Sequence, residues 1–228
     1  EVLDKNVNSD VNELNPILSP DGKTLYFSRS NHPDNSGGKK DKEDIWYSEL
    51  GADGKWQLAK NAGAPLNNEY PNFVSSISST TPDGKSVVML LGNKYDKNGD
   101  SKLAGVSMSS NVGGNWSKPV ALKIEDDYNF HEKANYFLAN NRKTLLMSVQ
   151  REDSRGDRDL YVSFMRADSS WSRPLNLGAV VNTAGEESAP FLALDDKTLY
   201  FSSNGFSGYG GTDNYVTKRL DDTWTNWS

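Results

Sequence analysis

The sequence has no cysteine, only two histidines and no long hydrophobic run. Without cysteine the chain can form neither disulfides nor thiolate metal sites. His32 and His131 lie in separate loops and lack the spacing of a paired metal site, so we expect no bound metal and no cofactor. A membrane-spanning helix needs about 18 consecutive apolar residues, and we therefore expect no direct membrane insertion.

Basic residues are outnumbered and never form a long cluster. The chain has 25 Lys and Arg against 31 Asp and Glu, which gives a net charge of −6. Nucleic-acid surfaces need clustered Lys and Arg to neutralise phosphates, and here the longest basic stretch, Lys39–Lys42, is interrupted by Asp41. These observations exclude a nucleic-acid partner.

The sequence does contain a repeat of about 50 residues, present four times, with one complete copy at Glu187–Trp224. Each copy has a β-branched and aromatic strand opened by Lys, a further strand opened in three of four copies by Asp, and a Trp seven or eight residues later. The Lys-led strands are Lys23–Ser28, Lys85–Leu90, Lys143–Ser148 and Lys197–Ser202, the following strands are Asp44–Ser48, Gly105–Ser109, Asp159–Ser163 and Asp213–Thr217, and the tryptophans are Trp56, Trp116, Trp171 and Trp224. Short strands in a repeat of this length are typical of a β-propeller.

We therefore predict an all-β fold, a β-propeller with four blades of four antiparallel strands, in a single domain over residues 1–228. The chain stops where the fourth strand of the last blade should run, and Val2–Asn8 matches the ends of such strands at Leu66–Asn68 and Val181–Thr183. The N-terminal strand is thus expected to complete the last blade and close the ring, which removes exposed sheet edges. The alternative is a fragment of a five- or six-bladed propeller.

Turn residues and tryptophans support this blade pattern. Ser19–Lys23 and Thr81–Lys85 carry the Pro-Asp-Gly sequence of a tight turn. The third repeat has Asn140–Lys143 instead, where we expect Asn to take the left-handed conformation in place of Asp-Gly. Trp56, Trp116 and Trp171 are expected to play equivalent packing roles.

Binding is expected on the side where the long loops and the links between blades gather, because binding groups concentrate on loops held by a rigid scaffold. The recurring glutamates at the start of the innermost strands form either a ring of carboxylates for a cation or basic side chain, or hydrogen bonds to loop amides. Asp44, Asp159 and Asp213 are expected to anchor the loops. The candidate binding residues are Glu13, Arg29, Glu69, Glu132, Arg151, Glu187, Asn204 and Tyr209. For the arginines, Asn204 and Tyr209 the alternative is an ordinary surface position.

No catalytic motif is present. The sequence has neither a Gly-x-Ser-x-Gly elbow nor a Ser-His-Asp order, so we expect no catalytic residues and no enzyme. Paired carboxylates for glycoside hydrolysis stay open, since their spacing depends on the fold.

The stretches Ser19–Ser28 and Asp44–Tyr47 resemble the TolB-type, WD-like propeller repeat of bacterial envelope proteins. Ser202–Gly205 with Gly208–Asp213 is similar to the version in Bacteroidota, where such propellers are often joined to an OmpA-like peptidoglycan-binding domain, including the PorE-like propellers of type IX secretion. The chain departs from this pattern because repeat two lacks the third-strand Asp, repeat three lacks Pro-Asp-Gly, and no OmpA-like domain is present. The resemblance therefore does not assign peptidoglycan binding to this chain.

The resemblance implies a periplasmic protein, associated with the outer membrane and monomeric outside its complex. We expect a non-enzymatic scaffold that binds a protein partner in the cell envelope. The alternatives are a carbohydrate-binding or glycoside-hydrolase-like propeller, with exposed aromatics such as Tyr209 and Phe206 stacking on sugars, and a structural spacer.

Overall fold

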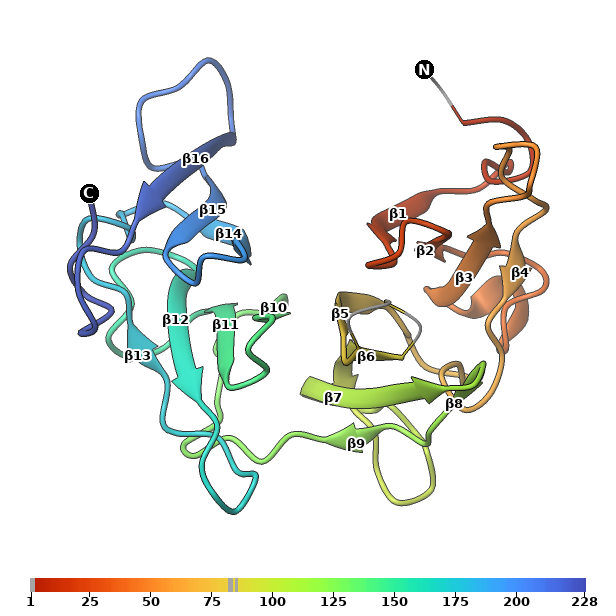
Figure 1. Cartoon of the computed structure of the whole chain (residues 1–228), viewed down its shortest axis with the longest axis horizontal. Coiled ribbons are helices and arrows are strands. Elements are labelled where there is room, and N and C mark those ends of the chain that lie inside the picture. Colours follow the sequence, from red (N-terminus) through yellow and green to blue (C-terminus); the bar gives the residue numbers. More distant parts are fainter. Residues whose placement is uncertain (1–2, 82–83, 85) are drawn as a thin grey trace. The chain divides into compact units, whose positions relative to one another are not determined.

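The computed structural model describes residues 3–81, 84 and 86–228. The chain divides into two compact units, Glu1–Ala121 and Leu122–Ser228, and each unit contains two antiparallel sheets (Figure 1). Whether the two units form the expected single domain stays a prediction.

The first unit holds two sheets in which neighbouring strands follow one another in sequence. The first sheet comprises β1 (Glu13–Leu18), β2 (Thr24–Arg29), β3 (Asp44–Glu49) and β4 (Lys60–Asn61). A short 3-10 helix, η1 (Gly38–Lys40), lies in the loop between β2 and β3. The second sheet comprises β5 (Val74–Ser79), β6 (Val87–Lys94), β7 (Leu103–Val112) and β8 (Asn115–Trp116), and β9 (Val120–Ala121) also pairs with β7.

The second unit repeats this organisation. Its first sheet comprises β10 (Asn135–Leu138), β11 (Thr144–Val149), β12 (Asp159–Phe164) and β13 (Leu175–Asn176). Its second sheet has three described strands, β14 (Glu187–Leu192), β15 (Thr198–Ser203) and β16 (Asp213–Lys218). A single bridge between Arg219 and Trp227 marks where a fourth strand would run. The chain is therefore all-β and has the four blade-type sheets of a four-bladed β-propeller arrangement.

The N-terminal segment does not form the expected strand. Val2 lies outside the described residues, and residues 3–8 form a turn in which the Val7 and Asn8 amides donate to the Asp4 carbonyl. The Asp4 carboxylate also accepts the Asn6 amide at 3.0 Å, a local bond that competes with strand pairing. The Asn6 carbonyl accepts a hydrogen bond from the Ala59 amide, which lies within the first unit. The strand prediction is therefore wrong for residues 3–8, and ring closure, which these hydrogen bonds do not show, stays a prediction.

Alternation along β2 gives the first sheet two apolar faces. In β2, Leu25 and Phe27 join a cluster with Val7 and Trp46, whereas Tyr26 belongs to a different cluster that includes residues of the second sheet. Successive strand side chains point to opposite faces, so a central strand can pack on both sides. All six residues of β11 are buried, as expected of a central strand in a stack of sheets.

The short turns use an acidic or amide side chain as acceptor for the backbone. The amides of Lys23, Lys143 and Lys197 donate to the side chains of Asp21, Asn141 and Asp195, respectively. The left-handed position is taken by Gly22, Arg142 and Asp196, with φ of 71°, 56° and 53°. The expectation that Asn takes this conformation in the third repeat is wrong: Asn141 supplies the acceptor and Arg142 takes the positive φ. In the turn expected at Thr81–Lys85, residues 82, 83 and 85 lie outside the described residues.

Asp195 makes its turn sensitive to acid. Hydrogen bonds from the Thr198 amide, the Thr198 hydroxyl and the Lys197 amide lower the pKa of this carboxyl from 3.8 to about 2. Because the folded-state pKa is depressed, these bonds stabilise the fold above pH 3.8 and are lost as the pH falls through about 2. We expect wild type to be more stable than Asp195→Asn, which keeps an acceptor but cannot titrate, at pH 5, and we expect most of this difference to be lost near pH 2. Urea midpoints measure this, and a difference that is the same at both pH values would contradict it.

Candidate functional site

Two of the predicted binding residues, Glu13 and Arg29, form an internal ion pair. They are direct partners across β1 and β2, and Arg29 Nε lies 3.1 Å from Glu13 Oε1. Arg29 also donates to the Val7 carbonyl at 2.6 Å, and its guanidinium carbon lies 4.3 Å from the Trp46 ring centroid. Only 6% of the Arg29 side chain is exposed. The pair therefore ties the N-terminal segment to the first sheet.

Arg151 and Glu187 are likewise buried and internally bonded. The Arg151 guanidinium donates to the Asp126 carbonyl at 2.8 Å and to the Asp126 carboxylate at 3.1 Å. Glu187, with no exposed surface, accepts from the Thr183 amide and hydroxyl at 2.9 and 2.6 Å and from the Ser203 hydroxyl at 2.7 Å. A partner can contact only accessible groups, so this placement favours structural roles for both side chains.

The other four predicted residues are exposed. Tyr209 extends fully into solvent, while the Asn204 side chain accepts the Glu186 amide at 2.7 Å. Glu69 and Glu132 lie in the segments that precede β5 and β10. The exposed loop residues are thus accessible to a partner, and their binding role stays a prediction.

The sequence pattern suggested that the four glutamates are structurally equivalent, but the structure shows that they are not. Glu13 and Glu187 each accept the amide of the residue four positions earlier, Ser9 and Thr183. In the second sheet the residue with this role is Asn72, which accepts the Asn68 amide at 2.8 Å. The sequence holds a signal that could have identified Asn72 as this residue. A spacing of five residues separates an asparagine from the acceptor in all three cases: Asn8 and Glu13, Asn67 and Asn72, and Asn182 and Glu187.

The third-strand aspartates anchor the loops, which confirms the expectation for them. Asp44, Asp159 and Asp213 each accept a backbone amide of the preceding loop, at 2.7, 2.9 and 3.0 Å. In the β1–β4 sheet and the β10–β13 sheet, the aspartate also accepts a hydrogen bond from an asparagine side chain. The side-chain oxygen of that asparagine accepts a hydrogen bond from a second asparagine. The paired asparagines are Asn61 and Asn67, and Asn176 and Asn182.

The expected equivalence of the tryptophans is wrong. Trp171 is 1% exposed, whereas Trp56 and Trp116 are half-buried. Trp56 packs on the cluster around Val7, and Trp116 lies beside Tyr26 of the neighbouring sheet. The backbone setting differs as well, since Trp116 pairs with β7 inside a short strand, while Trp56 and Trp171 form isolated bridges.

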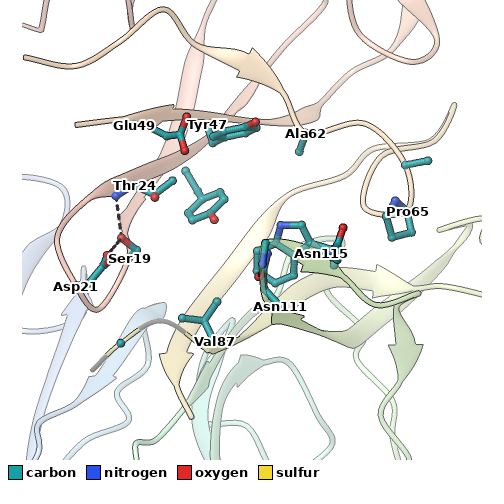
Figure 2. A pocket seen from close by; sticks show the side chains of 15 residues that line it. Ser19, Asp21, Thr24, Tyr47, Glu49, Ala62, Pro65, Val87, Asn111 and Asn115 are labelled. Carbon is teal, nitrogen blue, oxygen red and sulfur yellow. Dashed lines mark hydrogen bonds between the residues drawn. The ribbon is translucent and has the colours of Figure 1, made fainter. Parts of the chain in front are cut away.

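Trp116 lines a cavity of about 510 Å³ between the two sheets of the first unit. Its walls come from β2 and β3 of the first sheet, from β6, β7 and β8 of the second, from the turns that follow β1 and β7, and from the link after β4. Figure 2 shows Tyr47 and Glu49 on one wall and Asn111 and Asn115 on the facing one. Sequence reasoning had placed binding on the long loops and did not find this cavity.

Aromatic rings form one part of the lining. Tyr26 and Tyr47 are direct partners across β2 and β3, with ring centroids 6.2 Å apart. The Trp116 ring meets Tyr26 edge to face at 6.1 Å. Burial, with Tyr47, Asp21 and Glu49 nearby, raises the pKa of Tyr26 to about 12. Tyr26 is therefore neutral at physiological pH.

Carboxylates and amides form the rest of the polar lining. A hydrogen bond from Ser19 lowers the pKa of Asp21, which keeps this side chain ionised. Glu49 Oε2 lies 3.4 Å from the ammonium of Lys60, at the edge of the first sheet. None of the described residues that line the cavity is basic. Across the described chain, no group of three or more His, Cys, Asp or Glu residues is placed to hold a metal ion.

No protein-family model matches the chain, and no curated protein matches it. Among solved structures, the GH43 BlXynB protein from Bacillus licheniformis is similar with a TM-score of 0.51 and 14% identity over 95% of this chain and 41% of that one. The periplasmic gluconolactonase PpgL from Pseudomonas aeruginosa has a TM-score of 0.47 and 12% identity over 93% of this chain, which spans 54% of its length. The α-L-arabinofuranosidase from Lactobacillus brevis has a TM-score of 0.48 and 12% identity over 96% of this chain and 72% of that one. At 14% identity, the likeness to the GH43 protein concerns the fold alone.

The described part of the chain contains no helix with the length and hydropathy that crossing a membrane requires.

Proposed function

We propose that this chain is a non-enzymatic binding module of the bacterial cell envelope, acting in the periplasm near the outer membrane, and that it binds a protein partner. The observation that carries the proposal is the cavity of the first unit. It combines aromatic rings, carboxylates and amides around about 510 Å³, a volume within the usual range for ligand sites of about 300–1,000 Å³. The envelope location is supported by the resemblance of the repeat.

The cavity replaces the buried arginines as the main contact site. The guanidinium groups of Arg29 and Arg151 donate hydrogen bonds to internal carbonyls and carboxylates. A partner would have to break those bonds to contact either side chain. The rings of Tyr47 and Trp116 are only half-buried. Aromatic residues dominate binding energy at many interfaces, which supports a contact here. Tyr209 and Asn204 stay as candidate contacts on the exposed loop of the second unit.

Carbohydrate binding is the second candidate, favoured by Trp116 beside Asn111 and Asn115. Glycoside hydrolysis needs one carboxyl that stays protonated as the general acid. Asp21 is unsuited to that role because its pKa is lowered, which favours binding over hydrolysis.

Replacing Trp116 by alanine tests the cavity as the binding site. The probes are a lysine-centred hexapeptide and a neutral xylo-oligosaccharide, titrated into the chain and followed by NMR shifts of the cavity residues. We expect the Kd of whichever probe binds to rise at least about tenfold, since aromatic hot spots contribute about 2 kcal/mol. Trp56→Ala is the matched control, because Trp56 holds the corresponding repeat position outside the cavity.

The two variants distinguish binding from folding. Trp116→Ala and Trp56→Ala each remove a half-buried indole, so both should retain the far-UV spectrum of the wild type. If neither probe binds the wild type, or if both variants weaken binding equally, the cavity is not the binding site.

A further inference from the structure

We infer that the cavity of the first unit recognises a basic side chain, a lysine or arginine of the protein partner, through Glu49 and Asp21 together with the Tyr47 and Trp116 rings. This inference rests on the proposed function, because it names the chemistry that the cavity takes. Three features of the lining carry it: its charge, the position of Lys60, and the mixture of rings and carboxylates.

The described residues of the lining carry charge of one sign only. Asp21 and Glu49 supply two carboxylates, and no lysine, arginine or histidine is among the described lining residues. A phosphate or carboxylate ligand would meet like charge, which disfavours binding, whereas a cation meets complementary charge. The cavity is therefore suited to cationic groups and unsuited to anionic ones.

Lys60 of this chain shows how a cation fits at the rim. Its ammonium lies 3.4 Å from Glu49 Oε2 and 5.9 Å from the Tyr47 ring centroid. A carboxylate beside a ring face attracts a cation by charge and by the ring quadrupole. Both side chains of this ion pair are more than half exposed, at 60% and 57%, and exposed pairs contribute little. A partner's ammonium or guanidinium can therefore displace Lys60 from Glu49.

The lining also accommodates the stem of a basic side chain. Val87, Ala62 and the Trp116 ring provide apolar surface, and lysine and arginine bury their methylene stems against such surface while the charged head stays at polar groups. Thr24 and Glu49 are direct partners across β2 and β3, so a hydroxyl oxygen lies next to the carboxylate as a further acceptor. A neutral sugar would use the ring and the asparagines but would not depend on Glu49.

The test compares peptides that differ at one position. Hexapeptides centred on lysine, arginine, norleucine or glutamate are titrated into wild type, Glu49→Gln and the control Glu69→Gln, an exposed glutamate outside the cavity. We expect the lysine and arginine peptides to bind at least about tenfold more tightly than the norleucine peptide. We also expect Glu49→Gln to remove most of that preference, Glu69→Gln to leave it unchanged, and the affinity to fall between about 0.05 M and about 0.5 M salt.

Lys60→Gln gives a second measurement with the opposite sign. Removing the competing ammonium should tighten binding of the lysine peptide by about two- to fivefold, which a loss of folding would not produce. Equal affinity for the norleucine and lysine peptides, or unchanged binding in Glu49→Gln, would overturn the inference. If the neutral oligosaccharide binds in a Trp116-dependent way while the basic peptides do not, the cavity remains a binding site and only its assigned ligand is wrong. If no probe binds, the proposed function fails as well.

Discussion

Replacing Trp171 by alanine is expected to destabilise the second unit by about 3–5 kcal/mol. The indole is the largest fully buried side chain, with 1% of its surface exposed. Its backbone fixes the segment around it, because the Trp171 amide donates to the Lys123 carbonyl at 2.8 Å and its carbonyl accepts the Glu125 amide at 3.0 Å. Alanine leaves a cavity that this restrained backbone cannot easily close. The free energy of unfolding from urea titration measures the loss.

The matched control is Trp56→Ala in the first unit. Trp56 makes the same kind of isolated bridge, with Leu50 instead of Met165, but its side chain is only half-buried. We therefore expect a loss smaller than that of Trp171→Ala, since less apolar surface leaves the protein interior. An unchanged melting temperature in Trp171→Ala would contradict the packing described for the second unit.

The sheets could be predicted because their signals are local. The Lys-led β-branched and aromatic runs correspond to β2, β11 and β15, and in the second repeat to β6, where Lys85 lies outside the described residues. Short turns and alternation of side chains depend on neighbouring residues alone. The N-terminal segment resisted prediction because Val2–Asn8 has a strand-like composition, while Asp4 caps a turn within residues 3–8.

The candidate site could not be predicted because it depends on register between strands and on the packing of two sheets. Tyr26 and Tyr47 meet only because β2 and β3 pair in one register, and Trp116 joins them from another sheet. The same limit applies to Arg29. In the sequence, Arg29 comes directly after a strand, a position that suits either an exposed side chain or an internal ion pair. The pairing of Glu13 with Arg29 across β1 and β2 decides that the side chain is buried.

Glu187→Ala is expected to reduce the free energy of unfolding by about 3 kcal/mol. The carboxyl group is fully buried and accepts three hydrogen bonds, two from Thr183 and one from the Ser203 hydroxyl. Alanine removes the acceptor and leaves these donors unpaired in the interior, where each unsatisfied group costs about 1–3 kcal/mol before relaxation.

Glu69→Ala is the matched control, because the sequence pattern made Glu69 and Glu187 equal members of one set of glutamates. Glu69 is exposed, and surface substitutions away from such networks usually change stability by less than about 0.5 kcal/mol. Glu187→Gln should fall between wild type and Glu187→Ala, since its amide keeps one acceptor oxygen and directs two donors at the hydroxyls of Thr183 and Ser203. Urea midpoints of the three variants decide the matter: equal small effects of Glu69→Ala and Glu187→Ala would return both residues to a shared binding role.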